Sequence, residues 1–367
     1  MSQQFQLRFS PSLANKPKAP KPVGIIDHRA PSPPSTTSVG TVSPAPEKKL
    51  VFDPFDNPSP PMLVCPLPPY HNLVLNKFAI VPEHFILTTT EYKEQTHLLE
   101  REDLEATRAC IEAYQQYTGE EGGRGDKEET ELYAFFNCGE HSGASQPHRH
   151  LQLLVVDKMR EGLEGLETTR EGRWEVLAQR LIDDTKETIT QKLPFKTFAE
   201  RLTPGMSGEE LHALYLRLYR RARDAVRQHH QQSSHPSPAS PGSQQSSQQP
   251  EDQSNGADEI QTGGEATISY NLAMTRGVMV IVPRLAEGSA IVERKLDGNG
   301  EQGEEVVGKL ALNGTVLAGT ALVKSQREWD ALRKNPSRVG ELLGVIGVPN
   351  GPEVEERRRS PERKGVL

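Results

Sequence analysis

The sequence predicts an α+β fold, in which an antiparallel sheet carries helices on it. Short strand-like segments occur in neighbouring pairs with turn residues between them. Pro82 separates 72–81 from 84–89, and a Thr-Arg-Gly turn separates 266–274 from 278–282. Two longer segments place apolar residues at helical spacing. Strands joined by turns, with helices grouped between them, are typical of this fold class.

The first globular part continues after these two strands with a helix. Apolar residues recur at helical spacing near residues 101–117, among glutamate, alanine and arginine. A charged, glycine-containing loop is expected at 119–129, and two further strands at 133–138 and 149–157.

A second helix is expected over residues 208–227. Ser207 and Glu210 form an S-x-x-E capping box at its start, and apolar residues then follow on one helical face. After the strands at 266–274 and 278–282, the sequence predicts a small-residue segment at 310–324 and a short helix at 328–332.

Composition divides the chain into folded and unfolded stretches. Only 34% of the 367 residues are apolar, so some stretches cannot bury enough surface to offset the entropy of ordering them. The expected parts are a partly flexible N-terminal arm at 1–48, a globular part with a helical insertion at 49–228, a disordered Ser/Gln/Pro linker at 229–265, a second globular part at 266–349 and a charged tail at 350–367.

Charge and cysteine content exclude several classes of protein. A formal net charge of -7 gives no global attraction to nucleic acid or to an anionic membrane, so neither is expected as a partner. Cys65, Cys110 and Cys138 have no C-x-x-C spacing, which disfavours a disulfide framework or a thiolate zinc site. Because no apolar secretory segment is present, we expect a cytoplasmic protein with a nuclear share.

The most informative segment is 137–152, which leaves one strand, crosses a small-residue loop and enters the next strand. Side chains alternate along a strand, so His148, His150 and Gln152 share one face, and Arg149 shares the other face with leucines. Polar nitrogen and amide groups on one face, backed by apolar residues on the other, predict the wall of a site.

The loop before this strand has the composition of an anion-binding loop. Gly143, Ala144 and Ser145 let the backbone approach a ligand closely, and their N–H groups can donate to phosphate oxygens. The Ser145 hydroxyl and the Gln146 amide add further donors. The sequence therefore predicts a phosphate cradle that leads into a pair of histidines.

Histidine suits nucleophilic attack on phosphorus. A neutral imidazole is a good nucleophile near pH 7, provided that its other nitrogen is held as a donor. Of the pair, His150 lies deeper in the strand and is better held. Gln152 can bond a phosphate oxygen but cannot shuttle protons, so this strand favours transfer to a phosphate acceptor over hydrolysis.

The strand and its loop, N-C-G-E-H-S-G-A-S-Q-P-H-R-H-L-Q, resemble the fungal diadenosine tetraphosphate phosphorylases (ATP adenylyltransferases). These belong to the galactose-1-phosphate uridylyltransferase-like branch of the histidine-triad superfamily. Further similar stretches are F-Q-L-R-F-S-P-S-L-A-N-K-P at 5–17, H-N-L-V-L-N-K-F-A-I-V-P-E-H-F-I-L-T-T at 71–89, L-P-F-K-T-F at 193–198, S-Y-N-L-A-M-T-R-G-V-M-V-I-V-P-R at 269–284 and, more loosely, L-A-G-T-A-L-V-K at 317–324.

The resemblance implies a fold, a reaction and a set of site residues. The fold would be a duplicated histidine-triad unit, with 49–228 catalytic and 266–349 completing the same sheet. The reaction would be phosphorolysis of diadenosine tetraphosphate to ADP and ATP, and its reverse, with Mg²⁺ accompanying the polyphosphate. His150 would carry the adenylyl group, assisted by Gln152 and His148. Nucleotide and phosphates would contact Lys16, Asn76, Lys77, Asn137, Gly143, Ala144, Ser145, Gln146, Asn271, Thr275, Arg276, Met279 and Arg284.

Other interpretations of these residues stay open at this point. His148 and His150 would also fit a zinc site, with His141, His71 or His84 as a third ligand, or two core histidines.

Single residues and the activity also have alternatives. Lys16 fits a solvated arm, Asn76 and Lys77 an exposed strand face, and Met279 the core. The rival activities are a dinucleoside polyphosphate hydrolase and a catalytically inactive nucleotide-binding regulator.

Overall fold

A computed structural model describes residues 5–15, 53–121, 131–163, 174–182, 193–234, 261–296 and 302–350. Lys16, most of the expected N-terminal arm and the expected charged tail from residue 351 lie outside these residues. No helix in the described part of the chain is long and apolar enough to cross a membrane.

The centre of the molecule is an eight-stranded antiparallel sheet, as the sequence predicts. Its strand order is β2 (Leu63–Leu67), β3 (His71–Leu75), β4 (Phe85–Thr89), β6 (His150–Val155), β5 (Leu132–Cys138), β8 (Ser269–Met274), β9 (Val278–Arg284) and β7 (Phe198–Arg201). Because β8 pairs directly with β5, the two globular parts share one sheet, and Asn137 lies opposite Asn271.

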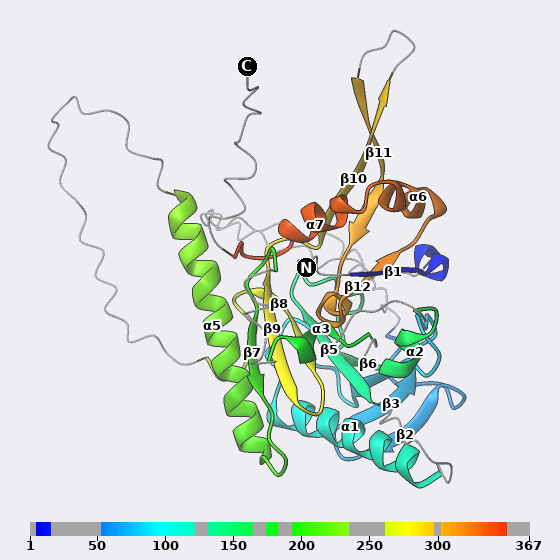
Figure 1. Cartoon of the computed structure of the whole chain (residues 1–367). Coiled ribbons are helices and arrows are strands. Elements are labelled where there is room, and N and C mark those ends of the chain that lie inside the picture. Colours follow the sequence, from blue (N-terminus) through cyan, green and yellow to red (C-terminus); the bar gives the residue numbers. More distant parts are fainter. Residues whose placement is uncertain are drawn as a thin grey trace, which may run out of the picture.

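Two long helices cover one face of this sheet (Figure 1). They are α1 (Arg101–Glu121) and α5 (Gly208–Ser234), and their apolar sides pack on β5, β6, β8 and β9. The predicted capping box is present: the Ser207 N–H donates to Glu210 Oε2 at 2.7 Å, and the Glu210 N–H donates to Ser207 Oγ at 3.2 Å. The two bonds satisfy backbone N–H groups at the start of α5.

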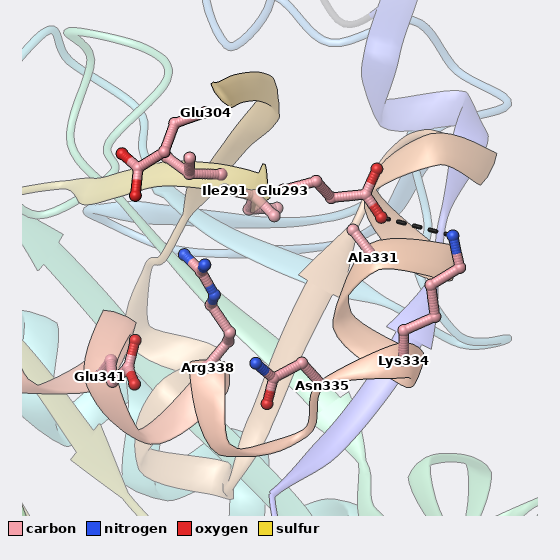
Figure 2. Close-up of a pocket in the computed structure, with 9 residues that line it drawn as sticks. Ile291, Glu293, Glu304, Ala331, Lys334, Asn335, Arg338 and Glu341 are labelled. Atoms are coloured by element: carbon pink, nitrogen blue, oxygen red, sulfur yellow. Dashed lines mark hydrogen bonds and ion pairs between the residues drawn. The ribbon is translucent and has the colours of Figure 1, made fainter. Parts of the chain in front are cut away.

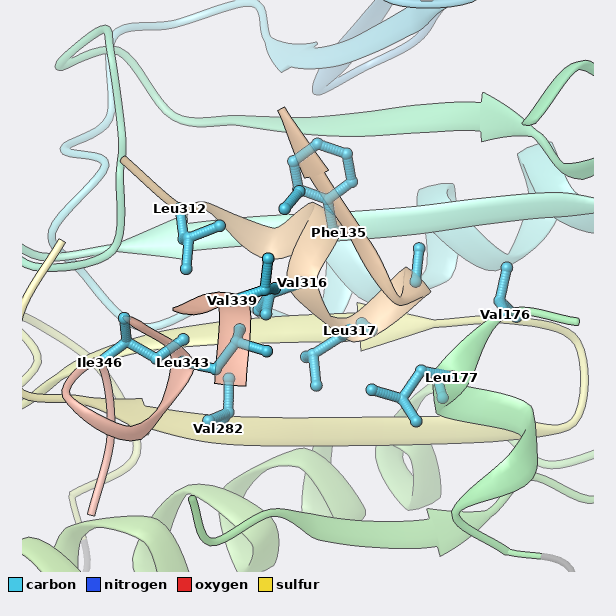
Figure 3. Close-up of a cluster of buried hydrophobic side chains, with 14 of the residues drawn as sticks. Phe135, Val176, Leu177, Val282, Leu312, Val316, Leu317, Val339, Leu343 and Ile346 are labelled. Atoms are coloured by element: carbon cyan, nitrogen blue, oxygen red, sulfur yellow. The ribbon is translucent and has the colours of Figure 1, made fainter. Parts of the chain in front are cut away.

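The C-terminal elements cover the other face. They are β10 (Gly288–Leu296), β11 (Gln302–Ala311), the 3₁₀ helix η2 (Gly314–Ala318), β12 (Thr320–Val323), α6 (Gln326–Lys334) and α7 (Ser337–Gly344), joined by α2 (Val156–Arg160) and α3 (Leu177–Arg180). Figure 3 shows how Leu312, Val316 and Leu317 pack with Phe135 and Val282 of the sheet. The hairpin β10–β11 projects away from the body (Figure 1).

The N-terminal strand lies beside the C-terminal part. β1 (Gln6–Phe9) pairs in parallel with β12, and the Thr320 hydroxyl donates to Gln6 Oε1 at 2.8 Å. A short 3₁₀ helix, η1 (Pro11–Asn15), follows. Residues separated by most of the chain therefore form one small sheet over the site face.

Two expectations about element boundaries were wrong. The strand expected at 72–81 ends at Leu75, because Asn76 Oδ1 accepts the Phe78 N–H at 2.9 Å and turns the chain. The linker expected at 229–265 is helical through Ser234, where α5 continues, and Glu265 bridges to His97. Gln228, Gln231 and Gln232 are good helix formers, which favours the longer helix. Residues 235–260 lie outside the described part.

Candidate active site

His150 lies at the start of β6 and is only 3% exposed. Its Nδ1 lies 2.8 Å from the carbonyl oxygen of His148. A carbonyl can only accept, so Nδ1 carries the proton, and Nε2 of the neutral ring carries the lone pair. A nucleophilic imidazole needs a fixed donor of this kind.

A buried glutamine that sequence reasoning missed holds the backbone of His150. The pairing of β5 with β6 ends at Phe135 and Gln152. Beyond this pair, the two strands separate toward the loop. Gln95 fills that gap: its Oε1 accepts the His150 N–H at 2.7 Å, and its Nε2 donates to the carbonyls of Asn137 at 2.9 Å and His150 at 3.1 Å. Nothing in the local sequence marks Gln95, because its partners lie over 40 residues away in the chain.

His148 is bound by protein oxygens on both ring nitrogens. Nδ1 lies 2.7 Å from Asp53 Oδ2, and Nε2 lies 2.9 Å from the Thr89 hydroxyl and 3.0 Å from its carbonyl. The other histidines considered as zinc ligands have separate surroundings: His141 is exposed, and His71 bonds Asp103 on the helix-covered face. No three His, Cys, Asp or Glu side chains among the described residues are placed to hold a metal ion.

Gln152 is oriented by His84. The Ile80 N–H donates to His84 Nδ1 at 3.3 Å, so the ring proton is on Nε2, which lies 3.0 Å from Gln152 Oε1. The oxygen of the Gln152 amide therefore accepts from His84, and its NH₂ group is the end that can donate to a ligand. Asn76 contacts the same ring, with its Nδ2 3.3 Å from Nδ1.

A buried network behind the loop joins Asn137 to the second part of the sheet. Asn271 Nδ2 donates to Asn137 Oδ1 at 2.9 Å and to the Ser142 carbonyl at 2.8 Å. Asn137 Oδ1 also accepts the Gly314 N–H at 2.8 Å, and Arg284 Nη1 donates to Asn271 Oδ1. The Asn271 amide and the Asn137 side-chain oxygen are thereby used within the protein, where they join β5 and β8 to the loop.

Arg284 is a deeply buried cation near the site, at 2% exposure. Its Nη2 donates to the carbonyls of Ala286, Glu287 and Leu312 at 2.9 to 3.0 Å. Burial lowers the pKa of Arg284 to about 9, against the opposing charge of Glu287. The guanidinium is used to join chain segments, which places Arg284 behind the loop.

The loop itself forms one wall of a small cavity of about 80 Å³. Gly143 has a φ of +80°, and a Cβ there would lie 2.7 Å from the Leu312 carbonyl, so only glycine fits. Binding pockets for whole small molecules measure about 300–1,000 Å³, so this cavity matches a phosphate group and not a nucleoside. Its lining consists of Leu13, Gly143, Ala144, Ser145, Gln152, Glu287, Ala311, Leu312, Asn313, Leu322 and Lys324.

Lys324 is a second residue that sequence reasoning missed. It follows β12 and lines the same cavity as Gly143 and Ser145. The signal was present in the stretch L-A-G-T-A-L-V-K, whose last residue it is. Neither the loop nor β6 predicts it, because β12 reaches the cavity only through the packing of the C-terminal part.

Several predicted residues are not brought to this cavity. Met279 is fully buried in the cluster beneath α5, since neighbouring Val280 faces the site side. Thr275 and Arg276 lie in the turn between β8 and β9, at the end of β8 away from Asn271, and Arg276 is exposed. Lys77 is exposed in the turn after β3.

A separate groove of about 420 Å³ lies between the hairpin β10–β11 and the helices α6 and α7 (Figure 2). Glu293 and Lys334 form an ion pair of 3.4 Å across it, and Arg338 and Glu341 line its other side. The groove contains none of the residues that the sequence singled out, and His150 lies on the eight-stranded sheet, which includes neither β10 nor β11.

The central antiparallel sheet holds an oriented imidazole, His150, and a glutamine amide, Gln152, which lines a cavity of phosphate size. This combination is typical of a nucleotidyltransferase. Two family models match the chain: the Ap4A phosphorylase N-terminal domain over residues 40–125 and 126–164, and the ATP adenylyltransferase C-terminal domain over residues 191–349. The chain belongs to this family of Ap4A phosphorylases, where Ap4A is diadenosine tetraphosphate.

Individual relatives agree with the family models. Diadenosine tetraphosphate phosphorylase 2 of Saccharomyces cerevisiae is 27% identical over 356 residues, which cover 95% of this chain and 84% of that protein. Yeast Ap4A phosphorylase Apa2 in complex with AMP superimposes with a TM-score of 0.54 at 22% identity, covering 82% of this chain and 83% of that chain. Its complex with Ap4A gives 0.50 at 22% identity, covering 81% and 80%. These two structures support the fold.

Proposed function

We propose that this chain catalyses the phosphorolysis of diadenosine tetraphosphate to ADP and ATP, and the reverse reaction, through an adenylyl group carried on His150. The observation that carries the proposal is the hydrogen bond from His150 Nδ1 to the His148 carbonyl, which assigns the lone pair to Nε2. The family membership and the AMP and Ap4A complexes of the structural relative support nucleotides as substrates.

The reaction would proceed in two displacements at one phosphorus atom. In the first, His150 Nε2 attacks the α-phosphorus, an N–P bond forms, and the P–O bond to the departing ATP breaks. The ring then carries a positive charge, because Nδ1 keeps its proton, and the His148 carbonyl stabilises that proton. In the second, an oxygen of inorganic phosphate attacks the same phosphorus, the N–P bond breaks, ADP leaves and the ring is neutral again.

Gln152 favours phosphate over water as the acceptor. Its NH₂ group can donate to a charged phosphate oxygen, but an amide neither takes up nor releases a proton near pH 7. Water must lose a proton when it attacks, whereas a phosphate dianion is already charged. The polyphosphate leaving group is a weak base, so its departure requires no acid. This chemistry favours the phosphorylase over the hydrolase.

The small cavity would hold the phosphates that leave or attack. Gly143, Ala144 and Ser145 would supply the loop backbone, and Lys324, which lines the same cavity, would supply positive charge. Ala144 N–H itself bonds the Ser142 hydroxyl at 3.3 Å, so we assign the stronger donor role to its neighbours. Gln146, Asn76, Lys77 and Lys16 remain proposed contacts to the nucleotide.

A divalent cation such as Mg²⁺ would accompany the polyphosphate. The cavity wall includes one carboxylate, Glu287, which pairs with Lys309 at 3.2 Å. Mg²⁺ is commonly bound by one or two carboxylates together with substrate phosphates and water, so this donor set fits a substrate-borne ion. The ion would neutralise phosphate charge, and Glu287 would hold it beside the loop.

The fold and the place of action are also proposals. We suggest that β2–β3–β4–β6–β5 and β8–β9–β7 correspond to two histidine-triad units, with only the first keeping the histidines; the continuous sheet supports this. We further propose a cytoplasmic protein with a nuclear share.

The decisive experiment follows the adenylyl group. Protein is incubated with diadenosine tetraphosphate labelled at the α-phosphorus, quenched in alkali, in which phosphoramidates survive, and digested for peptide mapping. We expect label on the peptide that contains His150, ADP formation only when phosphate is added, and neither result for His150→Asn. His141→Asn is the matched control, because His141 is exposed in the neighbouring loop. Product without added phosphate would identify a hydrolase, and nucleotide binding without label would identify a regulator.

A further inference from the structure

We propose that Asp53 is a positioning residue for the nucleophile His150, an inference that rests on the proposed function. Asp53 lies in the segment before β2, and its two carboxylate oxygens have separate tasks. Oδ2 lies 2.7 Å from His148 Nδ1, and Oδ1 accepts the Phe55 N–H at 2.9 Å. The Asp53 side chain therefore connects the segment before β2 to His148 and Phe55, both of which contact the His150 ring.

Asp53 can act on His150 by two routes. The first runs through His148, which is 1% exposed. The Thr89 hydroxyl lies 2.7 Å from the Glu91 carbonyl and donates its only proton there, so His148 Nε2 must be the donor to Thr89. With Asp53 bound to Nδ1, the ring is held at both ends. A side chain fixed in this way restricts its own backbone, and the His148 carbonyl is the acceptor that sets the tautomer of His150.

The second route runs through Phe55, which is 6% exposed. Its ring centroid lies 5.0 Å from that of His150, with an interplanar angle of 42°, and 5.8 Å from that of His148, with an angle of 81°. Phe55 also packs on Val74 and Ile86 of the sheet. The bond from its N–H to Asp53 fixes the turn that places this ring beside the nucleophile.

The two routes predict a specific pattern for substitutions. Asp53→Ala removes both bonds and leaves the buried Nδ1 of His148 without its acceptor, so the His150 ring loses its fixed tautomer and position. Misplacement of a reacting group by about 1 Å can cost about a hundredfold in rate, and we expect kcat to fall about ten- to hundredfold. Asp53→Asn keeps an oxygen for Phe55 and turns its NH₂ group toward His148 Nδ1, which accepts it when the ring is neutral with its proton on Nε2. The ring stays held at both ends, so kcat should recover to within about threefold.

The test combines kinetics with a measurement that needs no turnover. Phosphorolysis by Asp53→Ala, Asp53→Asn and the control Asp56→Ala is compared with the wild type; Asp56 is exposed three residues further on. In parallel, ¹⁵N NMR of histidine-labelled protein reports the ring tautomer of His150. We expect the Nδ1–H tautomer in the wild type, Asp53→Asn and Asp56→Ala, and a tautomer mixture with lowered kcat and a KM within about twofold in Asp53→Ala.

The contrary outcomes are distinct. Wild-type kcat and an unchanged His150 signal in Asp53→Ala would overturn the proposal, as would an Asp53→Asn variant that is as impaired as Asp53→Ala. If Asp53→Ala does not fold, Phe55→Leu tests the second route alone, and unchanged kcat there would reject it. A wild-type protein without phosphorolysis would refute the proposed function, while the NMR result would still decide the role of Asp53.

Discussion

The two faces of strand β6 differ in what their buried polar groups do. On the helix-covered face, Arg149 Nη1 bonds Asp103 and Glu100 at 2.9 Å each, and His71 bonds Asp103 at 2.8 Å. On the other face, the bonds to His148 and His150 assign donor and acceptor roles to particular ring nitrogens.

Burial therefore does not distinguish the two faces, because Arg149 is 2% exposed and His150 is 3% exposed. The charges around Arg149 neutralise one another, which holds α1 to the sheet. The bonds around His150 orient a lone pair. A buried polar network can therefore hold elements together, as around Arg149, or fix the tautomer of a ring, as around His150.

The largest expected effect is on the helix-covered face. Asp103→Asn leaves Arg149 and His71 without their shared carboxylate, and breaking a buried ion pair on one side costs about 3–5 kcal/mol of unfolding free energy. Urea denaturation measures this, with Glu105→Gln, an exposed acid of the same helix, as the control. A loss below about 1 kcal/mol would show that the cluster contributes little to stability.

The same residue predicts acid sensitivity. Burial raises the pKa of Asp103, but the hydrogen bond from His71 and the charge of Arg149 outweigh it, so the pKa lies below its ordinary value of 3.8. A carboxylate whose folded pKa is depressed stabilises the fold above the unfolded pKa, and that stability is lost as pH falls through the folded value. The wild type should lose more stability than Asp103→Asn below about pH 4.

The next largest effect is on the site face. Gln152→Ala removes the oriented NH₂ group, and losing one donor to a developing phosphate charge costs about 100- to 1,000-fold in kcat. The unfolding free energy should change little, in contrast to Asp103→Asn. Steady-state phosphorolysis and urea denaturation of the same preparation measure both. Unimpaired kcat would remove Gln152 from the reaction.

A smaller effect is expected at His84, which acts through Gln152. His84→Ala removes the donor that fixes the Gln152 amide. We expect kcat to fall about tenfold, which is near the lower end of the effect of losing a hydrogen bond to a charged group. In a double-mutant cycle, His84→Ala should add little to Gln152→Ala, because the amide that His84 orients is gone. Additive losses would assign His84 an independent role.

The smallest effect is expected at Met279. Met279→Leu conserves volume in the cluster beneath α5, so it should cost less than about 1.5 kcal/mol and leave KM for the dinucleotide unchanged. A raised KM would restore Met279 to the nucleotide pocket and blur the distinction between the two faces.

Local patterns predicted the parts of this molecule that depend on local geometry. The alternation that separates His150 from Arg149 is a property of any strand, and the Ser207 capping box is complete within four residues. The alternation rule could not place Met279. Because β9 is apolar on both faces, the sequence does not show which face each of its side chains occupies.

Long-range partners were beyond sequence reasoning. Asp53, His84 and Gln95 hold the site residues through single side chains whose partners lie tens of residues away. Their neighbours in the sequence resemble ordinary turns, and only the folded sheet shows that Gln95 completes the gap between β5 and β6. Lys324 depends in the same way on the packing of β12.

The parallel pairing of β1 with β12 affects when the small cavity can form during translation. Leu13 and Lys324 line the same cavity. After Leu13 has been added, the ribosome must therefore add about 300 further residues before it reaches Lys324. At translation speeds of about 5–20 residues per second, this interval lasts roughly 15 seconds to a minute. The residues of β6 are thus synthesised well before Lys324, and the cavity has its full lining only after Lys324 has been added.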